Sequence, residues 1–165
     1  MTRATRNLSV LALVAVVLVA AVLWVGRRDY IRNPPTLTPI DPANVTHIGL
    51  DIPPIAAQAF EKRHGGWWRA QPSAARADDA RVDRLAKLAA TPVARWIPRT
   101  DVEPSDIGLE RPSATLTLDG VQLEYGGLTA LDDLRYVRVG DKIALVPRQY
   151  SPEAMLTRRA GETTP

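Results

Sequence analysis

The chain has 165 residues, a length that fits one domain with an appendage and leaves no room for a second domain of ordinary size. Its formal charge is +3, but residues 1–32 hold five arginines and one aspartate, so 16 of the 21 basic and 17 of the 18 acidic side chains lie beyond them. A nearly neutral body lacks the positive face that a phosphate backbone requires, which argues against a nucleic-acid partner. The absence of cysteine excludes disulfides, thiolate metal sites, cysteine nucleophiles and acylation on cysteine.

An apolar run near the start predicts a membrane anchor. Residues 8–25 read LSVLALVAVVLVAAVLWV, with one polar residue, and as a helix they would extend about 27 Å, close to the hydrocarbon thickness of a bilayer. We therefore expect a cytoplasmic N-terminus over residues 1–7, a transmembrane helix over residues 8–26 and the lipid bilayer as a partner along residues 8–25. The residues expected to anchor the chain are Leu11, Val16, Val19, Trp24, Arg27 and Arg28.

Two other interpretations of this run are a buried core helix and a cleaved signal peptide. A core helix of this length ordinarily carries a polar stripe, and the run exceeds the apolar region of a signal peptide, which is about 7 to 15 residues. No small-x-small cleavage site precedes Val22. The positive charges on the two sides are tied in number, with Arg3, Arg6 and the α-amino group before the run and Arg27, Arg28 and Arg32 after it. Orientation therefore depends on the tendency of long domains to translocate. The predicted localisation is the bacterial inner membrane, single-pass, with the C-terminal domain in the periplasm.

The rest of the chain predicts a linker, one domain and a tail. Residues 27–43 are rich in proline and predict a semi-rigid spacer. The domain is expected over residues 44–150, and residues 151–165 form a polar tail. Alternating Ile48, Leu50 and Ile52 predict a half-buried first strand, which Pro53-Pro54 ends.

One clear helix is predicted from Asp78 to about Ala90. Asp78 or Asp79 can cap its N-terminus, and apolar side chains at helical spacing share one face. Further along, Val93 to Ile97 is a candidate strand and residues 101–109 form a short helical turn.

Two hairpins give the strongest local signals. In residues 114–125 a turn at Asp119-Gly120 pairs Leu118 with Val121, Leu116 with Leu123 and Ala114 with Tyr125. Residues 135–146 repeat the pattern around Gly140-Asp141, pairing Val139 with Lys142 and Val137 with Ala144. The predicted fold class is therefore α+β: an N-terminal transmembrane helix, then a small antiparallel sheet with one main helix packed on it.

The order of these pieces resembles the bacterial domain-of-unknown-function family 4340. The matching positions are Trp67 or Trp68 after a Gly-rich turn, Ala77-Asp78, Gly108-Leu109 with Pro112, and Tyr136-Val137, within residues 45–150. The resemblance implies a membrane-anchored protein, and because some members are encoded beside transporter components, it implies such a component as a membrane-protein partner. This chain holds one copy of a unit that longer members repeat. The family carries no assigned chemistry.

Four aromatic residues form the candidate partner surface. Neighbouring residues of a strand point to opposite faces, so only one of Trp67 and Trp68 can face the core, and an exposed tryptophan near Phe60 or Trp96 would mark a binding surface. The alternative is a tryptophan packed over the sheet edge by arginine stems.

Catalytic and metal sites have weaker support. His47 and His64 are interpreted as solvated side chains, no G-x-S-x-G motif occurs, and Gly126-Gly127 lacks the lysine and helix of a phosphate loop. No metal and no cofactor are predicted.

The sequence therefore favours a non-enzymatic envelope protein that acts as a protein-binding or accessory module of an envelope or transport system. One alternative is an envelope hydrolase in which carboxylates such as Asp106 and Glu110 converge, with Asp101, Glu103, Asp132 and Asp133 as further acidic candidates. Another is a small-ligand sensor, which needs an apolar cavity beside the sheet.

Overall fold

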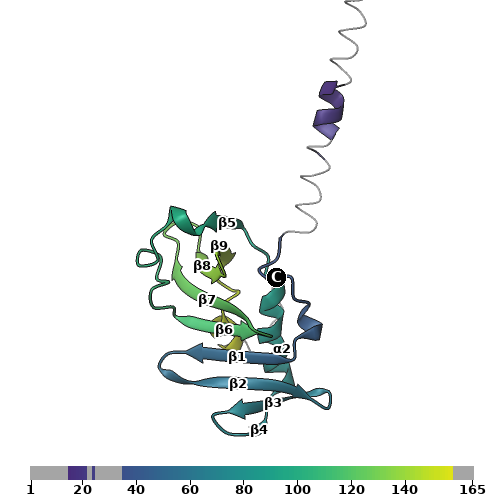
Figure 1. The fold of residues 1–165 in the computed structure, drawn as a ribbon, viewed down its shortest axis with the longest axis vertical. Coiled ribbons are helices and arrows are strands. Elements are labelled where there is room, and N and C mark those ends of the chain that lie inside the picture. Colours follow the sequence, from purple (N-terminus) through teal and green to yellow (C-terminus); the bar gives the residue numbers. More distant parts are fainter. Residues whose placement is uncertain (1–14, 22–23, 25–34, 158–165) are drawn as a thin grey trace, which may run out of the picture. The chain divides into compact units, whose positions relative to one another are not determined.

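The computed structural model describes residues 15–21, 24 and 35–157 (Figure 1). The chain divides into two compact units, Met1–Pro35 and Thr36–Pro165. In the first unit, residues 15–21 and Trp24 are helical, and the side chains of Val16, Val19 and Trp24 are exposed. The other predicted anchor residues, Leu11, Arg27 and Arg28, lie outside the described residues, as do the predicted N-terminus of residues 1–7 and residues 27–34 of the predicted linker.

The predicted membrane anchor requires correction. Within residues 15–21, 24 and 35–157, no helix has both the length and the apolar character needed to cross a bilayer. This finding contradicts the transmembrane helix over residues 8–26 and the single-pass inner-membrane localisation that depended on it.

The second unit is built on one antiparallel sheet. Its strand order is β4-β3-β2-β1-β6-β7-β8-β9-β5, and every neighbouring pair is antiparallel. The strands are β1 His47–Ile52, β2 Ile55–Arg63, β3 Gly66–Gln71, β4 Ala75–Arg76, β5 Arg95–Pro98, β6 Ala114–Leu118, β7 Val121–Leu128, β8 Leu134–Val139 and β9 Lys142–Pro147.

Within residues 35–157 the helices are few and short. They are α2 Asp79–Ala86 and α3 Pro152–Thr157, with the 3-10 turns η1 Pro42–Asn44, η2 Lys87–Ala90 and η3 Arg99–Asp101. The predicted α+β class is therefore wrong, because the nine-stranded antiparallel sheet dominates the described fold. The predicted main helix stops at Ala86 and tightens into η2, and strand β2 was missed since most of its side chains are exposed or half-buried and show no alternation.

Local signals of the sequence are confirmed at three places. The Asp78 side chain caps α2 by accepting a hydrogen bond from the backbone N–H of Arg81. Both hairpins adopt the predicted registers, with Leu116 opposite Leu123 and Val137 opposite Ala144. In the first hairpin Asp119 and Gly120 both have positive φ, as a two-residue turn between twisted strands requires.

The main core lies between one face of the sheet and α2. Val82, Leu85 and Ala86 of α2 belong to the same buried cluster as Ile48 of β1 and Leu116 of β6. Residues from Thr36 onward are part of this unit: the backbone N–H of Leu37 donates to Thr91, and Leu37 itself is buried.

A second, smaller core covers the opposite face of the sheet around β9. Ile143 packs there with Ile107 and Leu109. Ala144 and Val146 of the same strand point to the other face and belong to the main core. The segment that carries Ile107 and Leu109 is held by a 2.7 Å hydrogen bond from the backbone N–H of Gly127 to the carbonyl of Ile107. Strand β9 is thus buried on both faces, like a central strand, although it lies next to the edge of the sheet.

Candidate functional site

The structure does not bring the four predicted surface aromatics together. Phe60 of β2 and Trp67 of β3 are buried in the main core, at 8% and 1% exposure. Trp68 is 39% exposed, and the guanidinium of Arg76 lies 5.6 Å from the centre of its ring. Trp96 is half-buried on β5, at the other end of the strand order. Of the four, Trp68 and Trp96 reach the surface, and they do so in separate places.

Trp67 ties strand β3 to helix α2. Its indole Nε1–H donates to the Asp83 carboxylate at 2.7 Å, and its backbone N–H donates to Asp79 at 2.6 Å. Hydrogen bonds from the Arg76 side chain and from Trp67 hold the pKa of Asp79 below its usual value. The ring is therefore part of the framework of the domain.

The histidines do not form a catalytic arrangement. The ring Nδ1 of His47 lies 2.9 Å from the Thr46 hydroxyl and 3.6 Å from Asp119. In a nucleophile-histidine-acid triad the hydroxyl and the carboxylate contact different ring nitrogens, whereas here both face Nδ1. His64 is exposed in the turn between β2 and β3. Among the residues that the structure describes, no group of three or more histidine and acidic side chains is placed to hold a metal.

Asp119 instead holds the start of β1 in place through hydrogen bonds. Its carboxylate accepts hydrogen bonds from the backbone N–H groups of Thr46 and His47 and from the Thr46 hydroxyl. Burial alone would raise the pKa of Asp119, but these hydrogen bonds outweigh it and lower the pKa below its usual value of 3.8.

Asp119→Asn is expected to lower the free energy of unfolding by about 1 kcal/mol at neutral pH, because the charge-assisted hydrogen bonds to the backbone weaken. A depressed folded-state pKa adds stability above the unfolded pKa, and this stability is lost as the pH falls through the folded pKa. The difference between the two proteins should therefore shrink below the usual value of 3.8, as urea denaturation at a series of pH values can show. A difference that stays constant down to about pH 2 would contradict this role.

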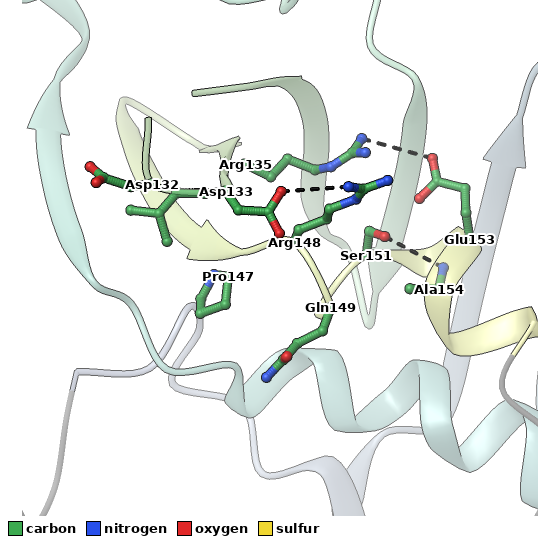
Figure 2. Close-up of a pocket in the computed structure, with 10 residues that line it drawn as sticks. Asp132, Asp133, Arg135, Pro147, Arg148, Gln149, Ser151, Glu153 and Ala154 are labelled. Carbon is green, nitrogen blue, oxygen red and sulfur yellow. Dashed lines mark hydrogen bonds and ion pairs between the residues drawn. The ribbon is translucent and has the colours of Figure 1, made fainter. Parts of the chain in front are cut away.

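A polar pocket of about 620 Å³ opens between the β8–β9 hairpin and α3. Figure 2 shows its basic side chains turned toward acidic ones: Arg148 pairs with Asp133 at 3.5 Å, and Arg135 faces Glu153 at 4.0 Å. The Ser151 hydroxyl oxygen accepts a hydrogen bond from the backbone N–H of Ala154 at the start of α3.

Arg135 in this pocket links three parts of the fold. It is 15% exposed and donates to the Ser113 hydroxyl at 2.7 Å and to the carbonyl of Gly126 at 3.2 Å, besides facing Glu153. Both basic side chains of this pocket, Arg135 and Arg148, interact with other groups of the same chain. We therefore interpret the contacts in this pocket as the ones that hold α3 against the sheet.

A second concavity, of about 660 Å³, lies along strand β5 and is called the β5 groove below. Its lining residues are Trp96, Ile97, Pro98, Arg99, Thr100, Asp141 and Lys142. The ammonium of Lys142 lies 6.0 Å from the centre of the Trp96 ring. Trp96 packs against the main core and Ile97 against the second core, so their side chains belong to opposite faces of the sheet. Asp141 and Lys142 also line the hollow, so it lies at the end of β5 where Pro98 pairs with Lys142.

The carboxylates that the hydrolase interpretation requires are dispersed. Asp106 and Glu110 are both exposed and line neither the polar pocket nor the β5 groove. Asp132 and Asp133 line the polar pocket, where Asp133 is paired with Arg148. Asp101 and Glu103 are exposed. The geometry gives this set of carboxylates no common substrate position.

No protein-family model matches the chain, and neither the curated proteins nor the solved structures contain a match to it. The resemblance to family 4340 and the expected transporter component therefore stay predictions.

Sequence reasoning identified Trp96 but missed the groove around it. One signal was present: proline within a sheet is confined to edge strands, and Pro98 ends β5. Nothing in the sequence indicated that Lys142 would line the same groove. Its place there depends on the pairing of Pro98 with Lys142, in strands that are distant in sequence.

Proposed function

We propose that this domain is a non-enzymatic protein-binding module that takes up an extended segment of its partner along the β5 groove. The observation that carries the proposal is a groove at the end of the strand that forms the edge of the sheet. Strand β5 ends the strand order and pairs with β9 alone among the described strands. An edge strand presents unpaired backbone N–H and C=O groups, which an added strand can satisfy.

The side chains at this edge support an incoming strand. Main-chain hydrogen bonds provide affinity in this mode of recognition, and pockets for alternate side chains provide specificity. Trp96 and Ile97 offer apolar surface on the two faces of the edge. Pro98 and the short length of β5 limit the added ladder to a few residues, which favours a short peptide over the edge of another large sheet.

The charges around the groove favour an acidic partner. Two exposed basic residues, Arg99 and Lys142, line it, against one acidic residue, Asp141. Complementary charge at the rim raises the association rate and selects among partners. The partner segment is therefore an extended peptide with alternating apolar side chains and flanking acidic ones.

Selection of a displayed library of random linear peptides on the full-length chain tests this proposal. We expect enrichment of peptides with alternating apolar and acidic residues. Their affinity should fall about tenfold on Lys142→Glu, because charge reversal at the rim opposes an acidic ligand. The affinities of selected peptides are measured by fluorescence anisotropy on each variant.

Matched variants at the other end of the sheet provide the control. Lys62 also lies over a tryptophan, 5.6 Å from the ring centre of Trp67, so Lys62→Glu removes a similar cation away from the groove and should leave affinity unchanged. Trp96→Ala should abolish binding, and Trp68→Ala should preserve it. Failure to enrich peptides, or equal losses in groove and control variants that remain folded by circular dichroism, would overturn the proposal.

A further inference from the structure

The loop between β7 and β8, residues 129–133, carries the most exposed large apolar side chain within residues 35–157. Leu131 in this loop is 93% exposed, and Leu128, the last residue of β7, is 42% exposed. Single exposed apolar residues are ordinary, but two leucines within four residues of each other form a surface that association can bury.

The chain holds this loop in a closed turn. The backbone N–H of Thr129 donates to the carbonyl of Leu134 at 2.7 Å, and the backbone N–H of Leu134 donates to the Thr129 hydroxyl at 3.1 Å. The backbone N–H of Arg148 donates to the carbonyl of Asp133, and the two side chains form an ion pair at 3.5 Å. Because the turn is already ordered, Leu131 loses less conformational entropy when a partner covers it.

The loop also carries a negative charge beside Leu131. Asp132 follows directly and is exposed. Figure 2 shows its carboxylate turned away from the pair of Asp133 and Arg148. The loop therefore presents an apolar side chain with an acidic one next to it.

The β5 groove has the complementary features. Trp96 and Ile97 are half-buried and Pro98 is exposed, so apolar surface is accessible there. Arg99 and Lys142 are exposed and line the same groove, which has one acidic lining residue. Complementary charge raises the association rate and selects among partners.

The loop and the groove lie at opposite ends of the β8–β9 hairpin. This hairpin pairs Leu134 with Pro147 at the end that carries the loop, and Val139 with Lys142 at the end that carries the groove. Along β8 these ends are about 17 Å apart, at about 3.4 Å per residue. Leu131 therefore cannot reach the groove of its own chain, and only another molecule can supply the loop.

We propose that the β7–β8 loop of one copy docks into the β5 groove of a second copy, with Leu131 against Trp96 and Asp132 toward Lys142. The inference rests on the proposed function in taking this groove as a binding surface, but the contact is made by the side chains of a turn and needs no added strand. The two surfaces differ, so each added copy leaves one loop and one groove free. Copies therefore associate head to tail, and the small contact makes this association transient.

Disulfide trapping on the full-length chain tests this pairing, because the sequence contains no cysteine and each introduced thiol is unique. Ala130→Cys places a thiol in the loop, and Thr100→Cys places one in the groove, both at exposed positions. The two variants are mixed in oxidised glutathione, and the dimers are separated by mass. We expect the mixed dimer in excess of the statistical ratio. A predominant homodimer of either variant would indicate a symmetric contact and overturn the proposal.

Matched substitutions locate the contact. Leu131→Ser in the Ala130→Cys chain should lower the yield of mixed dimer at least about fivefold, because the apolar contact is lost. Ile55→Ser in the same chain changes another exposed aliphatic residue and should leave the yield unchanged. Arg63→Cys, used in place of Thr100→Cys, puts the thiol at the far end of β2 and should give mixed dimer at the statistical ratio only. Equal yields in all folded variants would contradict this contact.

A peptide selected for the β5 groove separates this inference from the proposed function. The peptide should compete with the loop and lower the yield of mixed dimer. If peptides bind but the mixed dimer stays at the statistical ratio, the inference fails and the proposed function stands. If the mixed dimer forms and no peptide is enriched, uptake of an extended segment fails and the contact between copies stands. A yield that a saturating peptide leaves unchanged would place the loop outside the groove and overturn the inference.

Discussion

Trp67→Ala is expected to lower the free energy of unfolding by about 3 to 5 kcal/mol, a large share of the 5 to 15 kcal/mol typical of a domain. The indole is 1% exposed, and its removal leaves a cavity between β3 and α2 that the surrounding chain can fill only in part. The hydrogen bond from its ring nitrogen to Asp83 is lost as well. Urea denaturation followed by circular dichroism measures the change.

The adjacent tryptophan provides the matched control. Trp68 is 39% exposed, and Arg76 covers one face of its ring. Trp68→Ala should therefore lower the free energy of unfolding by about 1 kcal/mol or less. If the two substitutions cost the same, the assignment of Trp67 to the core and Trp68 to the surface is wrong.

Gly126→Ala is expected to destabilise the protein by about 2 to 4 kcal/mol, from overpacking and from the weakened hydrogen bond of the next residue. A Cβ atom at this position would lie 2.4 Å from the carbonyl oxygen of Ile107 and 3.0 Å from Cγ of Leu109. The obstacle is backbone, so the segment carrying Ile107 and Leu109 must move away from β7. Limited proteolysis should then cut near this segment faster than in the parent protein.

Gly127→Ala tests whether the distance from the added Cβ atom to Ile107 determines how much the free energy of unfolding falls. The added Cβ would lie 3.4 Å from the Ile107 carbonyl oxygen, an ordinary van der Waals contact. We therefore expect a change in unfolding free energy within about 0.5 kcal/mol and no new cleavage. Equal destabilisation by the two alanines would show that loss of glycine itself, rather than the docked segment, is responsible.

Local features of this fold could be predicted from the sequence. Asp119-Gly120 between alternating apolar residues determined both the turn and the register of the first hairpin. Asp78 marked the start of α2 because a short acidic side chain satisfies free backbone N–H groups there.

Features that depend on distant segments could not be predicted. Strand β2 carries Gln58, Glu61 and Lys62 on exposed or half-buried positions, so its pattern lacked the alternation of a half-buried strand. The position of β5 at the edge, and hence the groove beside Trp96, results from pairing with β9. The apolar run near the start predicted a membrane span from hydropathy alone, whereas no helix among the described residues is long and apolar enough to cross a bilayer.

The sheet consists of two runs of neighbouring strands, and this arrangement has a consequence for how the chain folds. Strands β1 to β4 and strands β6 to β9 each pair with strands close in sequence, so each run can form after closing short loops. The junction between them pairs Gly49 with Thr117, which requires a much longer loop to close. Until β6 arrives, β1 has an open edge with Ile48 and Leu50 uncovered. We therefore expect docking of the two halves to be the slow step of folding, the step at which self-association competes with it.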